Sequence, residues 1–172
     1  IWQLSKYINR NQFQLPIQNV DWVSRQRSDA YLYSNAYAVA ISLMGSPLFF
    51  QLTQYYTEKA RATVRHMLAV YKQYRDEIFK GYVFPVGHVP DDAGWTGFQD
   101  VVDSSAGYLL LFRELHNGSS SQEIRLSFIR SHSILLTDLL TGEKKKVMVD
   151  KSGRAEFTIE KPADFRFWRY SI

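Results

Sequence analysis

The spacing of the hydrophobic residues changes near Gly81. Before this position, apolar residues recur every three or four positions, which is the spacing of one helical face. After it, short apolar runs alternate with polar residues and are separated by turn sequences. We therefore expect two domains, a largely helical segment over residues 1–80 and an all-β module over residues 81–172.

Two helices are predicted in the first segment. The first covers residues 30–44, with Ser28 or Asp29 as its N-cap and Gly45 just beyond its end. The second covers residues 57–80, with Thr57 as its N-cap and Gly81 closing it. Its apolar stripe consists of Ala60, Val64, Met67, Tyr71, Tyr74 and Ile78.

Two short segments are harder to interpret. Residues 13–17 alternate as in a strand, although Pro16 favours a strand end or an edge. Residues 46–50 are ambiguous, because a Ser-Pro pair can begin a helix whereas a short apolar run can also be a buried parallel strand.

The second segment consists of short strands at close spacing, which is typical of an antiparallel sandwich or barrel. Ile124, Leu126 and Phe128 alternate with polar residues and predict a strand with one buried face. Gly97, between Trp95 and Phe98, indicates a close approach of two backbones, and we expect this segment to pack against the helices. The other predicted strands cover residues 82–84, 95–102, 108–115, 133–140, 147–150, 155–159 and 165–170.

Composition narrows the class of protein. The chain is 45% hydrophobic and 15% aromatic, which is ample for a packed core. It carries a formal net charge of +4, and its one basic cluster, residues 144–146, follows a turn, so we expect no nucleic-acid partner.

No cysteine is present, which excludes disulfides and thiolate chemistry. No apolar stretch is long enough to span a membrane, and no targeting signal indicates a compartment.

One polar cluster has the composition of a sugar-binding site. Trp22 can stack on the apolar face of a sugar, while Asp21, Arg25 and Arg27 can form hydrogen bonds with its hydroxyl groups. The structural alternative is that Asp29 caps a helix and the arginines are solvated.

Other chemistries lack support in the sequence. Asp91 and Asp92 occur in a turn sequence, so we interpret them as structural. The four histidines are scattered, and we expect no metal. No phosphate loop, dinucleotide fingerprint or nucleophile elbow is present, so we expect no cofactor and no serine nucleophile.

Several segments follow one another in a familiar order: residues 44–49, a long helix ending at Gly81, and then residues 81–87, 95–99, 107–114 and 138–143. In this order they resemble the C-terminal end of α-galactosidase-like glycoside hydrolases of the family 36 and 27 clan. The resemblance implies the fold class, a helical remnant of a (β/α)8 barrel followed by an antiparallel β-sandwich. It makes residues 30–44 the seventh barrel helix, 47–50 the eighth strand, 57–80 the last helix and 81–172 the sandwich.

The resemblance also implies that the catalytic carboxylates lie on the fourth and sixth barrel strands, upstream of Ile1. This chain alone is then expected to be inactive. Asp29 is the alternative candidate, because Arg25 and Asp29 match the Arg-x-x-x-Asp pattern around the acid/base of the family. However, only one further strand follows before the sandwich, where the family needs two.

The leading hypothesis is therefore the C-terminal segment of a glycoside hydrolase, which completes and stabilises the barrel. Its expected partners are carbohydrate, the rest of the parent chain and, through exposed helix faces, a second copy. The alternative is a non-catalytic carbohydrate-binding or protein-interaction sandwich. An exposed aromatic row would favour that alternative, and its candidate residues are Tyr82, Trp95, Tyr108, Trp168 and Tyr170.

Overall fold

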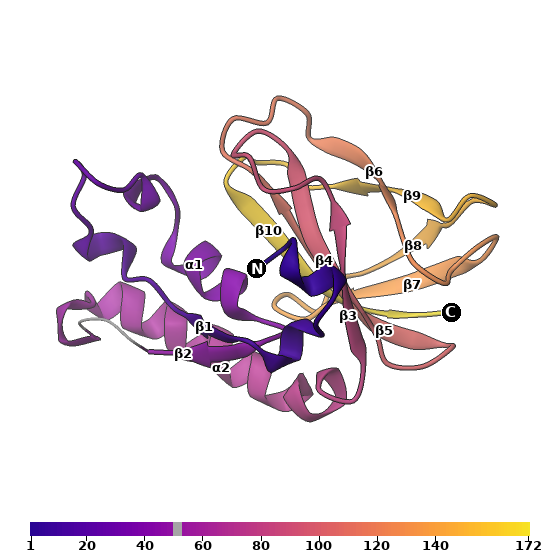
Figure 1. Cartoon of the computed structure of the whole chain (residues 1–172), viewed down its shortest axis with the longest axis horizontal. Coiled ribbons are helices and arrows are strands. Elements are labelled where there is room, and N and C mark those ends of the chain that lie inside the picture. Colours follow the sequence, from indigo (N-terminus) through magenta and orange to yellow (C-terminus); the bar gives the residue numbers. More distant parts are fainter. Residues whose placement is uncertain (50–52) are drawn as a thin grey trace.

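The computed structural model describes residues 1–49 and 53–172, which form two α-helices and ten strands (Figure 1). The helices are α1 (Asn35–Ser42) and α2 (Glu58–Ile78). The strands are β1 (Gln14–Pro16), β2 (Ser46–Leu48), β3 (Tyr82–Gly87), β4 (Trp95–Val101), β5 (Ala106–Arg113), β6 (Ser121–Arg125), β7 (Ser133–Asp138), β8 (Lys144–Met148), β9 (Arg154–Thr158) and β10 (Asp164–Ser171). Short 3₁₀ helices are η1 (Leu4–Lys6), η2 (Arg10–Gln12), η3 (Val20–Trp22), η4 (Ala30–Leu32) and η5 (Thr53–Tyr55).

The predicted antiparallel β module is confirmed as a six-stranded sheet in the order β3-β4-β5-β10-β7-β8. A separate antiparallel pair, β6-β9, lies beside it. In the helical half, β1 and β2 form a parallel pair, and α1 lies between them in the sequence (Figure 1).

The central strands of the six-stranded sheet are apolar on both faces. All eight residues of β5 are buried, and their side chains alternate between two cores. Tyr108, Leu110 and Phe112 join the core that contains α1 and α2. Leu109 and Leu111 join the core beneath β6 and β9. The helices and the β6-β9 pair therefore cover opposite faces of the sheet.

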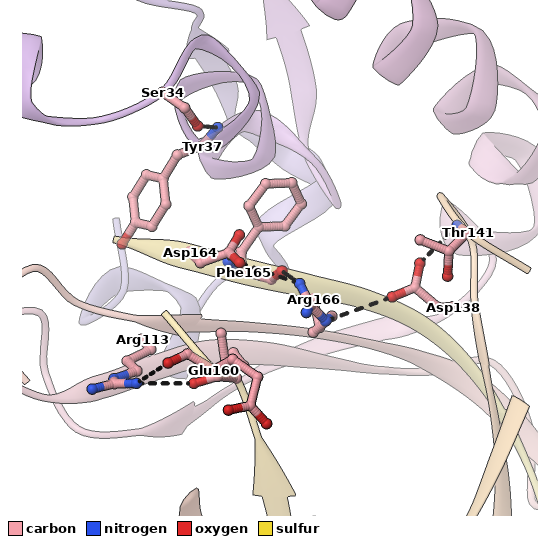
Figure 2. Close-up of polar contacts among 10 residues, drawn as sticks. Ser34, Tyr37, Arg113, Asp138, Thr141, Glu160, Asp164, Phe165 and Arg166 are labelled. Carbon is pink, nitrogen blue, oxygen red and sulfur yellow. Dashed lines mark hydrogen bonds and ion pairs between the residues drawn. The ribbon is translucent and has the colours of Figure 1, made fainter. Parts of the chain in front are cut away.

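The predicted start of the first helix is wrong. Asp29 makes no capping hydrogen bond, and η4 forms where the first turn was expected. The helix begins later because Ser34 is the N-cap, and its hydroxyl accepts the Tyr37 N–H at 3.0 Å (Figure 2).

The predicted end of that helix is also wrong. The residue with left-handed backbone is Met44, with φ of 60°, and not Gly45. A Cβ at Gly45 would lie 2.7 Å from Leu15 Cδ1, so Gly45 instead allows β1 to approach β2 closely.

The second helix agrees with its prediction, because the Thr57 hydroxyl accepts the Ala60 N–H at 3.2 Å and the predicted apolar stripe faces the core. The ambiguous Ser-Pro segment forms β2, while Phe50 lies outside the described residues. Neither α1 nor α2 has both the length and the apolar composition needed to cross a membrane.

Two predictions in the β module have opposite outcomes. A Cβ at Gly97 would lie 2.2 Å from the Leu110 carbonyl oxygen, which confirms the close backbone approach, and Phe98 packs into the helical core. The strand through Phe128 is wrong, because β6 ends at Arg125 and the Phe128 side chain is exposed.

Arg10 is a buried cation between the helices and the sheet. Its guanidinium group donates hydrogen bonds to the carbonyls of Ile41 and Leu43, at the C-terminal end of α1, and lies 3.8 Å from the centroid of the Phe98 ring. Burial lowers its pKa to about 9. A cation at this end of a helix is favourable because the exposed carbonyls carry partial negative charge.

Asp100 is a buried carboxylic acid beside Gly81. Within the described residues neither of its carboxyl oxygens has a hydrogen-bond partner. Burial, together with the nearby Glu77 carboxylate, raises the pKa of Asp100 from 3.8 to about 8.

This shift predicts that Asp100 makes stability fall as pH rises. Between about pH 4 and 8 the folded chain keeps a proton that the unfolded chain releases, so unfolding becomes easier with each added pH unit. From pH 5 to 8 the free energy of unfolding should fall by about 2–4 kcal/mol in the wild type, and this fall should be absent in Asp100→Asn. Urea denaturation at several pH values measures the difference. Parallel pH profiles for the two proteins would contradict the prediction.

Candidate functional site

The carboxyl ends of β1 and β2 meet at one edge of the parallel pair. The register runs from Gln14 opposite Ser46 to Pro16 opposite Leu48, and the Ile17 N–H continues the pairing to the Leu48 carbonyl at 2.9 Å. The segments that follow the two strands carry η3 and η5. Ligand sites in parallel α/β folds lie at such carboxyl ends.

An aromatic pair joins these two segments. The rings of Trp22 in η3 and Tyr55 in η5 are stacked, with 4.3 Å between their centroids and 15° between their planes. Both side chains remain accessible, since Trp22 is 55% exposed and Tyr55 is 47% exposed. Stacked rings of this kind form a flat apolar surface for the face of a sugar ring.

Asp21 lies next to this pair and connects the starts of the two helices. Its Oδ2 atom accepts hydrogen bonds from the Asn35 amide at 3.1 Å and from the Thr57 hydroxyl at 3.4 Å. Asn35 is the first residue of α1, and Thr57 is the N-cap of α2. Helix N-termini carry partial positive charge, which stabilises the carboxylate there.

The two predicted arginines do not join this cluster through any contact among the described residues. The Arg25 guanidinium lies over the Tyr31 ring of the same loop, 4.9 Å from its centroid. The Arg27 side chain is exposed, which agrees with the solvated alternative.

Asp29 lies elsewhere, on a cleft of about 530 Å³ between the loop that follows β1 and the six-stranded sheet. The Tyr33 hydroxyl donates a hydrogen bond to Asp92 across this cleft. Burial raises the pKa of Tyr33, and the bond to Asp92 raises it further. Burial also raises the pKa of Glu114, although the Gly94 N–H donates to its Oε2 atom at 2.9 Å.

The acidic turn has the expected structure. Asp91 Oδ1 accepts the Ala93 N–H at 3.1 Å, as in an Asx turn. Asp92 also has a role that the sequence did not indicate, because it receives the Tyr33 hydroxyl and lies 3.3 Å from the His116 imidazole. No group of three or more His, Asp or Glu side chains suited to a metal ion occurs within the described residues.

The proposed aromatic row of the sandwich is not on the surface. Four of its five members are buried, and only Tyr82 is open to solvent, at 67% exposure. The buried members are Trp95, Tyr108, Trp168 and Tyr170.

Sequence reasoning missed three members of the site around Trp22. Tyr55, Asn35 and Thr57 reach Asp21 and Trp22 only because β1 and β2 pair in parallel. Tyr55 of η5 gave no local signal, since its role depends on a contact with Trp22, which lies more than 30 positions away in the sequence.

Comparison with known proteins places the fold within enzymes that act on carbohydrates. No family model and no curated protein matches the sequence. Among solved structures, a noncanonic maltogenic α-amylase, AmyB of Thermotoga neapolitana, matches 99% of this chain and 44% of its own, with a TM-score of 0.62 and 12% identity. The galactosidase domain of the α-galactosidase-sucrose kinase AgaSK matches 92% of this chain and 21% of its own, with a TM-score of 0.58 and 10% identity.

A third match belongs to the resembled family. The family 36 α-galactosidase AgaA of Geobacillus stearothermophilus matches 84% of this chain and 20% of its own, with a TM-score of 0.57 and 15% identity. The chain thus spans less than half of each of these proteins. Its fold is one that occurs within family 36 α-galactosidases and other glycoside hydrolases.

Replacing Asp21 tests the polar connection between the helices. Asp21→Ala should lower the free energy of unfolding by about 1 kcal/mol, because two side-chain donors lose their acceptor and two helix N-termini lose a carboxylate. Urea denaturation measures the change. Asp76→Ala, at the exposed C-terminal end of α2, is the control and should change stability by less than about 0.5 kcal/mol. Equal effects of the two substitutions would rule out this role for Asp21.

Proposed function

We propose that this chain is the C-terminal segment of an α-galactosidase-like glycoside hydrolase, an enzyme that cleaves O-glycosidic bonds. In this proposal residues 1–80 complete a (β/α)8 barrel and residues 81–172 form the sandwich that stabilises it. The observation that carries the proposal is the order β1-α1-β2-α2, with β1 and β2 parallel, followed by the antiparallel sheet. The fold shared with glycoside hydrolases supports it.

The surface of the helical half fits an incomplete barrel. Within the described residues β1 and β2 pair only with each other, so each has an open edge. Seventeen large hydrophobic side chains are exposed in the described part of the chain, and eleven of them precede Tyr56. The remaining strands of a barrel would cover such edges and side chains, and in their absence a second copy is the expected substitute.

The catalytic carboxylates belong, in this proposal, to barrel strands outside this chain. A retaining glycosidase needs two carboxyl groups about 5 Å apart, one as nucleophile and one as acid/base. Asp29 lines the cleft with Tyr33 and makes no capping hydrogen bond. A single carboxylate cannot supply the pair that the retaining mechanism needs, so the proposal gives Asp29 no catalytic role.

The contribution of this chain to the active site is then the edge formed by Trp22, Tyr55 and Asp21. The stacked rings offer an apolar platform, and Asp21 offers acceptors for sugar hydroxyls. These groups follow the carboxyl ends of parallel strands, where barrel enzymes bind their substrates.

The first experiment compares hydrolysis of p-nitrophenyl α-galactoside by this chain and by the full-length gene product. We expect activity only in the full-length protein, because only there are both carboxylates present. Asp29→Asn should leave that activity within about threefold. Activity of this chain alone, lost in Asp29→Asn, would overturn the proposal, and so would a full-length protein that hydrolyses no glycoside.

The second experiment tests the aromatic platform in the full-length protein. Trp22→Ala should lower kcat/KM by roughly 10-fold, since an aromatic platform contributes on the order of 1–2 kcal/mol to sugar binding. Tyr82→Ala removes another exposed aromatic ring, far along the chain from this edge, and should leave kcat/KM unchanged. Equal losses in the two variants would show that the platform does not contact substrate.

A further inference from the structure

A groove of about 680 Å³ lies on the sandwich, away from the edge formed by Trp22 and Tyr55. Residues 85–87 of β3 form one part of its lining. Arg125, the last residue of β6, also lines the groove. The segment that joins β6 to β7 supplies Phe128, Arg130 and His132. The volume is within the range of small-molecule sites, roughly 300–1,000 Å³.

The groove is basic and contains no carboxylate. Arg125 forms no ion pair or hydrogen bond with the described part of the chain. It lies opposite Arg154 in the β6-β9 pair, and Arg154 is matched by Glu123 at 3.6 Å. Arg154 thus has a carboxylate as its counter-charge, whereas Arg125 has none among the described residues, so the guanidinium of Arg125 is available to an anion.

Phe128 is held in an unusual conformation beside these cations. Its φ of 62° lies in the left-handed region, which bulky side chains rarely adopt. Its ring is 74% exposed and contacts Phe84 edge-on, with 5.4 Å between the centroids. Burial of the ring therefore does little to offset the cost of the backbone conformation. When the surrounding structure holds a residue in a strained backbone conformation and burial of its side chain does not offset the cost, that residue often belongs to a ligand site.

The surrounding loop is firmly anchored on both sides of Phe128. The fully buried Gln99 side chain accepts the Ser127 N–H at 2.6 Å and donates to the Ser127 carbonyl at 3.0 Å. Ile129 is buried in the core, and Arg130 donates to the Ser152 carbonyl at 2.8 Å. The backbone that carries the exposed ring is thus held in place before any ligand arrives, which reduces the entropic cost of binding.

We propose that this groove binds an acidic saccharide, with a carboxylate or sulfate group on Arg125 and Arg130 and the sugar ring stacked on Phe128. Arginine binds planar anionic groups through paired hydrogen bonds, and an aromatic face accepts the apolar face of a sugar. Nucleic acid would need a longer run of cations than the groove provides. An acidic peptide added to the β3 edge would meet Pro85, which lacks an N–H to pair with it. The site is independent of the proposed hydrolase function.

Calorimetric titration of this chain tests the site with four probes: oligogalacturonate, sulfated dextran oligomers, neutral malto-oligosaccharide and polyphosphate. At least one acidic saccharide should bind 10-fold or more tightly than both the neutral saccharide and polyphosphate. Preference between the two acidic probes identifies carboxylate or sulfate as the recognised group. Failure of both acidic probes to bind would overturn the proposal, and so would equal binding of polyphosphate, which indicates a general anion surface.

Two variants separate binding from folding. Arg125→Gln should weaken binding of the acidic saccharide by 10-fold or more, whereas the control Arg65→Gln, an exposed arginine on α2, should not weaken it. Phe128→Gly should weaken binding of the acidic saccharide by roughly 10-fold and leave the midpoint of thermal unfolding unchanged or higher, because glycine adopts the left-handed conformation without strain. Unchanged binding in Phe128→Gly, or equal losses in Arg125→Gln and Arg65→Gln, would overturn the proposal.

Discussion

The structure depends on a sheet whose central strands have no polar face. Alternate side chains of β5 and β10 enter two different cores, so both faces of the sheet must be covered. Burying one large apolar side chain stabilises the folded state by about 1.5–3 kcal/mol. If either face of the sheet were exposed to water, several such side chains would lose this stabilisation. The helices cover one face and the β6-β9 pair covers the other. The edge formed by Trp22 and Tyr55 lies on the helical cover, whereas the groove around Phe128 lies between edge strand β3 and the segment that joins β6 to β7.

Directional polar contacts fix how the helical cover sits on the sheet. Glu77 of α2 accepts the Tyr108 hydroxyl at 2.5 Å and the Arg169 guanidinium at 3.0 Å, and the hydrogen bond from Arg169 lowers the pKa of Glu77. The Tyr71 hydroxyl donates to the Gly45 carbonyl at 2.5 Å, which ties α2 to the start of β2. Apolar packing alone would tolerate sliding, whereas these bonds have preferred geometries. They therefore hold the C-terminal half of α2 and the start of β2 in one position relative to the sheet.

Sequence patterns predicted correctly those elements whose caps and apolar stripes lie within a single segment of the chain. The apolar stripe of α2 and its Thr57 cap are complete within the segment, and both appear as expected. The start of α1 was misplaced because Ser28, Asp29 and Ser34 can all cap a helix, and packing selected Ser34.

Tyr55 could not be predicted, since its stacking on Trp22 requires the parallel pairing of β1 with β2. Phe128 was assigned to a strand from its alternation with Ile124 and Leu126, but Gln99 and Ile129 anchor that stretch as a loop. Thus the sequence indicated Asp21 and Trp22 of the one proposed site and no residue of the other.

The two exposed aromatic sites differ in charge, and this difference determines what each can recognise. Trp22 and Tyr55 cover one face of each other and lie beside Asp21, so the local field favours hydroxyl donors and disfavours anions. Phe128 has neither a stacking partner on its face nor a carboxylate in its groove, and Arg125 lies unpaired among the described residues. An uncharged sugar would leave that arginine without a counter-charge, whereas an acidic sugar would neutralise it. Under the two proposals, similar aromatic rings stand in opposite electrostatic settings on one chain, so that a neutral sugar suits the site beside Asp21 and an acidic sugar suits the site beside Arg125.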